Sequence, residues 1–148
     1  MAIGKIESLD HEARGIARQE GKAIFVDGAL PGERVEYASF RRKSSYELAH
    51  LVKVVKPSSA RVTPRCEHFG ICGGCAMQHM EPSAQLAAKQ RVLEDSLWHI
   101  GRVRPQQILP PIQGEAWAYR QRARLGVRRM PDASMLIGFH ERRSSYIA

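Results

Sequence analysis

The sequence predicts a mainly β protein with one long helix, which places it in the α+β class. Short apolar or alternating segments separated by turn formers fill residues 1–56. A helical pattern then occupies residues 83–100, and an alternating segment with a proline turn follows within residues 116–148. The chain has 148 residues and 43% hydrophobic residues, close to the globular average, which argues against a disordered chain.

The first 56 residues predict a small closed or partly closed barrel of the OB type. Turn-forming pairs stand between the segments: Glu20-Gly21, Asp27-Gly28 and Pro31-Gly32. Five short strands at such close spacing are typical of small barrels. The expected strands are Lys5–Leu9, Gly15–Arg18, Ala23–Val26, Arg34–Phe40 and Tyr46–Val55.

Basic residues on this barrel are candidates for nucleic-acid contact. Small barrels of this type often bind nucleic acids through basic and flat side chains gathered on one face. A basic loop lies beside Phe40 and Tyr46, although it would equally suit an ordinary solvated hairpin tip. The candidates are Arg14, Lys22, Arg41, Arg42 and Lys43.

All three cysteines lie within ten residues after a proline- and serine-rich segment, residues 57–65, which is expected to be a linker. Cys66, Cys72 and Cys75 have the spacing C-x5-C-x2-C, with two glycines in the tighter step. Thiolates so close together suit a shared iron–sulfur cluster or zinc ion. Alternatively, the three cysteines could be small hydrophobic residues buried in a core without a metal. The flanking residues argue against this, because they are polar and are interrupted by glycines.

The residues alone leave the identity of the metal open. Zinc would need a fourth ligand, which His68 or His79 could supply in a Cys3His site. A [4Fe–4S] cluster usually takes a fourth cysteine, and this sequence has none.

One helix is expected from Ser83 to Ile100. Pro82 is suited to its first turn and Gly101 to its C-terminal stop. Leu86, Leu93, Leu97 and Ile100 fall on one face. We expect this face to pack against the cysteine loop or the following sheet.

The segment after residue 116 predicts an antiparallel hairpin with one apolar and one arginine face. Residues 131–134 supply the turn and Met135–His140 the return strand. Like charges along one exposed face repel one another unless an anion is present, which favours an anion-binding face over pairing with Asp132, Glu141 or acids beyond this chain. The arginines expected on that face are Arg120, Arg122, Arg124 and Arg128.

The charge and cysteine content narrow the functional classes. The net charge is +8, and residues 116–148 are the most basic part, with seven arginines against two acids. This balance suggests a polyanionic partner, with nucleic acid the first candidate. The sequence shows no signal peptide and no apolar run of membrane-spanning length. Clustered cysteines without a secretory signal favour the cytosol and a metal over disulfides.

Three stretches together carry a resemblance to a known family. Residues 6–17 with residues 23–33 resemble a TRAM domain, a module found in several RNA-modifying enzymes. Residues 66–80 are similar to the iron–sulfur segment of the RumA/RlmD-type 23S rRNA (uracil-5-)-methyltransferases. Residues 119–125, 137–139 and 143–145 resemble the start of their central domain. The resemblance covers the whole chain, in the family's order.

The resemblance implies a TRAM domain over residues 1–56, a linker over 57–65, an iron–sulfur loop and helix over 66–115, and the start of a central β domain over 116–148. It also implies a cytoplasmic monomer that binds 23S rRNA. In the family, S-adenosylmethionine donates a methyl group to uracil C5 after a cysteine attacks C6. Cys66, Cys72 and Cys75 would be three of four [4Fe–4S] ligands.

The sequence lacks two features of the family pattern. It contains no fourth cysteine and no glycine-rich cofactor loop after a strand. We therefore expect an N-terminal fragment that has no catalytic or cofactor-binding residues of its own and is inactive alone. The alternative is a stand-alone TRAM RNA-binding module with a structural zinc site.

Overall fold

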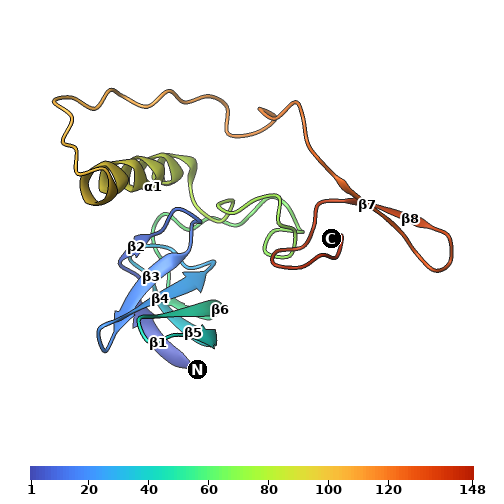
Figure 1. Cartoon of the computed structure of the whole chain (residues 1–148), viewed down its shortest axis with the longest axis horizontal. Coiled ribbons are helices and arrows are strands. Elements are labelled where there is room, and N and C mark those ends of the chain that lie inside the picture. The colour runs from blue at the N-terminus through green and yellow to red at the C-terminus, as the bar shows by residue number, and fades with distance from the viewer.

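The computed structural model describes residues 1–148 and contains a six-stranded sheet, one helix and a separate two-stranded hairpin (Figure 1). The predicted α+β class, mainly β with one long helix, is confirmed. The strands are β1 Ala2–Lys5, β2 Ser8–Leu9, β3 Gly15–Gln19, β4 Lys22–Asp27, β5 Arg34–Arg42, β6 Tyr46–Lys56, β7 Gly126–Arg129 and β8 Met135–Gly138. The helix α1 spans Pro82–Asp95, and the π-helical turn η1 spans Ser96–Ile100.

The six N-terminal strands form a curled sheet in the order β1-β5-β6-β4-β3-β2. All pairs are antiparallel except β4 with β6. The two edges curl toward each other, since a Cβ added at Gly4 of β1 would lie 3.4 Å from the Cβ of Ala17 on β3. The sheet is thus an open barrel, and we call it the barrel below.

Side-chain alternation in the barrel strands produces the core. Ile24 and Val26 of β4 and Val35 and Tyr37 of β5 point inward and are buried. Successive side chains in a strand face opposite sides, so one alternating pattern buries one face and leaves the other for solvent. The buried cluster comprises Ile6, Ala17, Ile24, Val26, Ala29, Val35, Tyr37 and Ala49.

The first predicted strand, Lys5–Leu9, is wrong in its bounds, because the chain turns a corner there. β1 pairs with β5 only as far as Lys5, and β2 then pairs with β3. Between them the amide of Ile6 donates to the carbonyl of Glu33 at 2.9 Å. The amide of Glu7 donates to the carbonyl of Ile16 at 2.8 Å. The change of partner at Ile6 and Glu7 divides one expected strand into two.

The segment of residues 57–65 is fixed to the barrel by a buried ion pair. Glu33 has a fully buried side chain, and the Arg61 guanidinium donates to both of its carboxylate oxygens at 2.5 and 2.7 Å. Arg61 also donates to the carbonyl of Gly28 at 2.7 Å. Burial alone would raise the pKa of Glu33, but hydrogen bonds from Arg61 and from the amides of Leu30 and Ser58 lower it below its ordinary value.

The helix forms where the sequence predicts it, beginning with Pro82 in the first turn. The Glu81 carboxylate accepts hydrogen bonds from the amides of Ser83 and Ala84 and caps the helix, at 2.9 and 3.2 Å. The prediction that its apolar face packs against the following sheet is wrong. No residue of α1 or η1 is buried, and Ile100 is 82% exposed, because no strand packs across this face.

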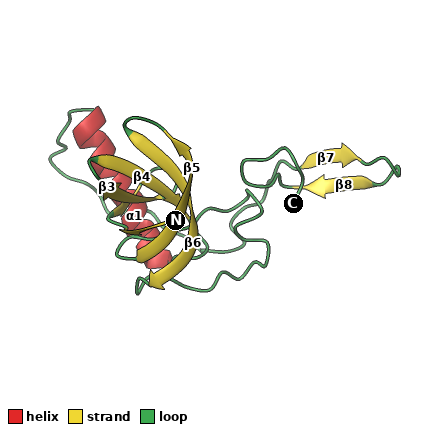
Figure 2. Cartoon of the chain, turned by 90° about the horizontal axis from the view of Figure 1, so that it is seen from below, coloured by secondary structure: helices red, strands yellow, loops and turns green.

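The C-terminal hairpin is shorter than predicted and extends away from the barrel (Figure 2). β7 begins at Gly126, so Arg120, Arg122 and Arg124 lie in irregular chain before the strand and not on its face. To extend β7 backward as a strand, residues 119–125 would have to form backbone hydrogen bonds with residues 139–145. Those residues instead bond to the cysteine loop and to one another, which leaves the expected strand unpaired.

Candidate nucleic-acid interface and cysteine loop

The cysteine loop, residues 66–75, is a series of tight turns held by its own backbone. The amides of Ile71 and Cys72 both donate to the carbonyl of His68, at 3.2 and 2.9 Å. The amide of Gly74 points at the Cys72 Sγ atom at 3.3 Å. Amide-to-sulfur hydrogen bonds of this kind stabilise a thiolate and are used around metal–thiolate sites.

All three cysteines are free thiols, and their chemistry suits a soft metal centre. Cys66 and Cys72 are half-buried and Cys75 is exposed. Their positions do not yet form a ligand set, because no group of three or more Cys, His, Asp or Glu side chains converges on one point. The donor chemistry therefore fits an iron–sulfur or zinc centre, whereas the loop would have to close further to hold one.

His79 is the buried polar residue next to this loop. Its ring is 3% exposed, lies 5.1 Å from the ring of Phe69, and has no hydrogen-bond partner on either nitrogen. Burial, assisted by the positive charge of Arg61, lowers the pKa of His79 to about 4, so its imidazole is neutral at pH 7. His68, the other predicted zinc-ligand candidate, is exposed and lies near Glu67.

The C-terminal segment docks on the cysteine loop. The amide of Gly73 donates to the carbonyl of His140 at 2.8 Å, and the amide of Arg142 donates to the carbonyl of Ile71 at 2.8 Å. Cys72 and Glu141 form an antiparallel bridge between these contacts. A Cβ at Gly73 would lie 2.9 Å from the His140 carbonyl oxygen, so the close approach requires glycine at that position.

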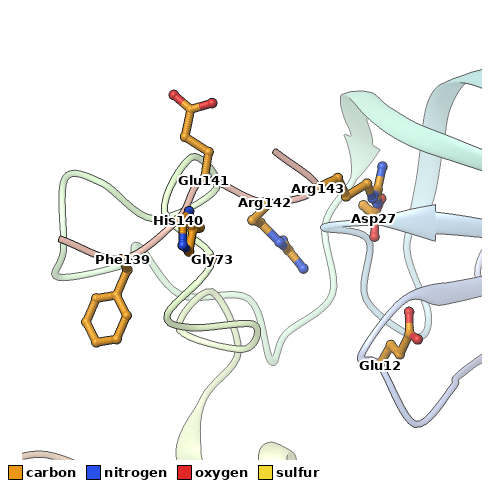
Figure 3. A pocket seen from close by; sticks show the side chains of 8 residues that line it. All are labelled: Glu12, Asp27, Gly73, Phe139, His140, Glu141, Arg142 and Arg143. Atoms are coloured by element: carbon orange, nitrogen blue, oxygen red, sulfur yellow. The ribbon is translucent and has the colours of Figure 1, made fainter. Parts of the chain in front are cut away.

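The same segment then reaches the barrel (Figure 3). Arg143 forms an ion pair with Asp27 at the end of β4, and its guanidinium lies 4.8 Å from the ring centre of Phe40 on β5. A pocket of about 400 Å³ opens at this junction. Its lining is mostly charged and consists of Glu12, Asp27, Gly73, Phe139, His140, Glu141, Arg142 and Arg143.

The predicted basic residues of the barrel fall into two groups. Arg14 is neutralised, because its guanidinium pairs with Asp10 at 2.6 Å and with Glu12 at 3.0 Å. Arg42 lies 3.4 Å from Glu47. The other basic residues have no acidic partner; Arg41 and Lys43 are exposed, and Lys22 is half-buried at the start of β4.

Aromatic rings accompany these cations on the outer face of the barrel. Phe25 and Tyr46 pack edge to face at 6.1 Å, with Arg14 over the Phe25 ring at 5.0 Å. Phe40 lies beside His50, with ring centres 6.2 Å apart and planes inclined by 15°. The sequence could have revealed His50, because alternation along β6 places it opposite buried Ala49. The approach of Arg143, over a hundred residues from Phe40 in sequence, had no sequence signal.

The arginines before and within the hairpin are accessible. Arg120, Arg122 and Arg124 are exposed and form no salt bridge. Arg128, on β7, is also exposed and lies 5.3 Å from the ring centre of Tyr146. Arg120, Arg122 and Arg124 thus lie together in one chain segment, whereas the basic residues predicted on the barrel lie on a separate surface.

The N-terminal barrel of this chain contains a TRAM domain. The family model described as "TRAM domain" matches residues 5–36, from β1 to the start of β5. Neither α1 nor η1 has the length and hydropathy that a membrane-spanning helix needs.

Over its whole length the chain matches the N-terminal part of RlmD-type 23S rRNA uracil-C5 methyltransferases, which confirms the resemblance found in the sequence. It is 81% identical over 149 aligned residues to the 23S rRNA (uracil(1939)-C(5))-methyltransferase RlmD of Dechloromonas aromatica, covering 100% of this chain and 34% of that protein. It is 64% identical to the protein of the same name from Bordetella avium, covering 97% and 30%. It is 60% identical to the protein of the same name from Aromatoleum aromaticum, covering 100% of this chain and 34% of that protein. The chain thus spans about a third of the length of these relatives.

Proposed function

We propose that the chain is the RNA-recognition part of an S-adenosylmethionine-dependent 23S rRNA uracil-C5 methyltransferase that acts in the cytoplasm as a monomer. The observation that carries this proposal is the 81% identity along the entire chain to a relative of that name. The TRAM barrel, residues 1–56, supplies one RNA-binding surface and the basic segment after residue 116 supplies a second.

Within this proposal the three thiols hold an iron–sulfur cluster. Cys66, Cys72 and Cys75 are three of its four ligands, and the cluster has a structural role. Support comes from the soft donor chemistry, the backbone amide directed at the Cys72 sulfur, and the docking of residues 140–142 on the loop. Closing the loop around a cluster would fix the C-terminal segment against the barrel. The 148 residues alone would not methylate RNA, since no glycine-rich cofactor loop follows a strand within them.

The RNA-binding part is tested by the salt dependence of affinity for an rRNA fragment. Replacing Arg120, Arg122 and Arg124 together with Ala should reduce the slope of log affinity against log salt by about 2, given ~0.7 per contacted phosphate. The measurement is a fluorescence anisotropy titration at several salt concentrations. The matched control replaces Arg18, Arg34 and Arg91, which removes the same charge elsewhere.

A slope that falls equally in both triple variants would show that only total charge matters. An unchanged slope in the first would remove this segment from the RNA contacts. If the wild-type chain binds no RNA at all, the proposed function itself is contradicted.

The metal part is tested by anaerobic purification with iron, sulfide and zinc analysis. Brown protein that contains iron and sulfide, and loses both on Cys72→Ser, would support the cluster. Colourless protein with one zinc would favour the stand-alone module with a structural zinc site.

A further inference from the structure

Phe40 is a large apolar side chain placed in an unusual position on the barrel. It lies near the end of β5 at an irregularity, where the pairing with β6 shifts register between Ser39 and Arg41. Its ring is 49% exposed, whereas Val35 and Tyr37 of the same strand are buried. The bulge therefore directs this ring outward, and core packing does not explain its presence.

A second ring with a nearly parallel plane adjoins Phe40. The His50 ring, from the neighbouring strand, lies beside Phe40 with its plane inclined by only 15°, and His50 is itself exposed. The Arg143 guanidinium rests 4.8 Å from the centre of the Phe40 ring. A planar group with delocalised charge thus already occupies this ring face.

Positive charge adjoins this surface. Arg41, Arg42 and Lys43 follow Phe40 directly in the chain, and only Arg42 has an acidic neighbour, Glu47 at 3.4 Å. On the other side of the ring, Asp27 is paired with Arg143. An exposed ring with phosphate-binding cations next to it is the combination by which single strands are bound.

We propose that Phe40 and His50 form a stacking platform for one unpaired nucleobase of the bound RNA, an inference that rests on the proposed RNA-binding function. The base takes the place of the Arg143 guanidinium on the Phe40 ring, and Arg143 keeps its ion pair with Asp27. Arg41 and Lys43 contact the phosphates that flank the base. The ligand is single-stranded, because bases inside a duplex stack on one another and do not expose a face.

The test uses the whole chain and a short unpaired oligoribonucleotide that carries the fluorescent base 2-aminopurine. Phe40→Ala should weaken binding roughly 5- to 150-fold, the range for loss of one base–aromatic stack. The slope of log affinity against log salt should stay unchanged, because no phosphate contact is lost. The wild type should quench 2-aminopurine fluorescence at one position of the RNA.

Two variants separate stacking from mere apolar contact. Phe40→Leu keeps a bulky apolar side chain but has no ring, and it should lose both affinity and quenching. Phe40→Tyr should restore both. Ile3→Ala is the control, since Ile3 is 53% exposed on β1 and pairs with Glu36, four residues before Phe40 on β5.

Three results would decide against the platform. If RNA binds but Phe40→Ala and Phe40→Leu behave like Ile3→Ala, the platform is refuted while the proposed function stands. Equal affinity for a duplex of the same sequence would refute the single-strand requirement. If the wild-type chain binds neither the unpaired oligoribonucleotide nor the duplex, the proposed function fails and the platform fails with it.

Discussion

The barrel and the C-terminal hairpin contain similar sequence patterns but differ in what their strands bury. Ile24 and Val26 on β4 are 2% and 0% exposed. Val127 on β7 and Ile137 on β8 are 61% and 64% exposed. Every buried side chain of the molecule lies at or before Met80. The hydrophobic contribution to stability is therefore concentrated in the first eighty residues.

This contrast shows that an alternating sequence determines which face of a strand is apolar, but not which other element will cover that face. In the barrel each strand has a neighbour on the sheet, and the inward faces meet in one core. The hairpin has two strands and no opposing layer. A two-stranded sheet without a packed face is marginal in water, however regular its side-chain pattern.

The largest expected change in stability comes from replacing an isoleucine in the barrel, compared with the same replacement in the hairpin. Ile24→Ala should lower the free energy of unfolding by about 2–5 kcal/mol, because it removes buried methyl groups and leaves a cavity. Ile137→Ala should change it by less than about 0.5 kcal/mol, because that side chain faces solvent. Urea unfolding followed by circular dichroism measures both. Similar losses in the two variants would contradict the division between the regions.

The next effect concerns the ion pair that joins the barrel to residues 57–65. Arg61→Ala leaves the Glu33 carboxylate buried without its cation, and we expect a loss of about 2–4 kcal/mol. Arg18→Ala is the matched control, because Arg18 is exposed and lies 3.8 Å from Glu7. That variant should lose no more than about 1 kcal/mol in the same urea titration. If Arg61→Ala is as mild as the control, the pair does not hold the segment.

The smallest effect is a pH dependence of stability that arises from His79, next to the cysteine loop. Since the pKa of His79 is lowered from 6.5 to about 4, the unfolded chain binds more protons than the folded chain between these values. The contribution of His79 is fully present above pH 6.5 and is lost as the pH falls toward 4. We expect a loss of about 1–3 kcal/mol across this window.

Unfolding free energies at pH 7 and pH 4.5 measure this change. His79→Gln should reduce the difference between the two pH values, whereas His99→Gln, at an exposed position, should leave it unaltered. An equal pH dependence in wild type and His79→Gln would assign the effect to other groups, such as Glu33.

Most of the barrel could be predicted from local patterns. Its turns contain glycine where the chain needs a positive φ, as at Gly21 and Gly28, and its strands alternate between these turns. The helix was also predictable, because Pro82 suits a first turn. The Glu33–Arg61 ion pair could not be predicted, because its partners are 28 residues apart and the composition of residues 57–65 is that of a linker.

The candidate site was predictable in its residues but not in its geometry. Spacing singled out the three cysteines, but it could not show whether their sulfur atoms converge on one point, which they do not do here. Alternation assigned Arg120, Arg122 and Arg124 to a strand, but the segment that would pair with it is held by the cysteine loop. Such competition between partners depends on tertiary contacts, which local patterns do not contain.

The ion pair between Glu33 and Arg61 also sets an order of events during synthesis. The chain emerges N-terminus first, so all six barrel strands, ending at Lys56, are available before the guanidinium that neutralises Glu33. Until Arg61 appears, burying the carboxylate would leave an unpaired charge, and that corner of the barrel stays hydrated. Arg61 precedes Cys66 by only five residues, so the cation that allows this corner to close becomes available shortly before the first thiol.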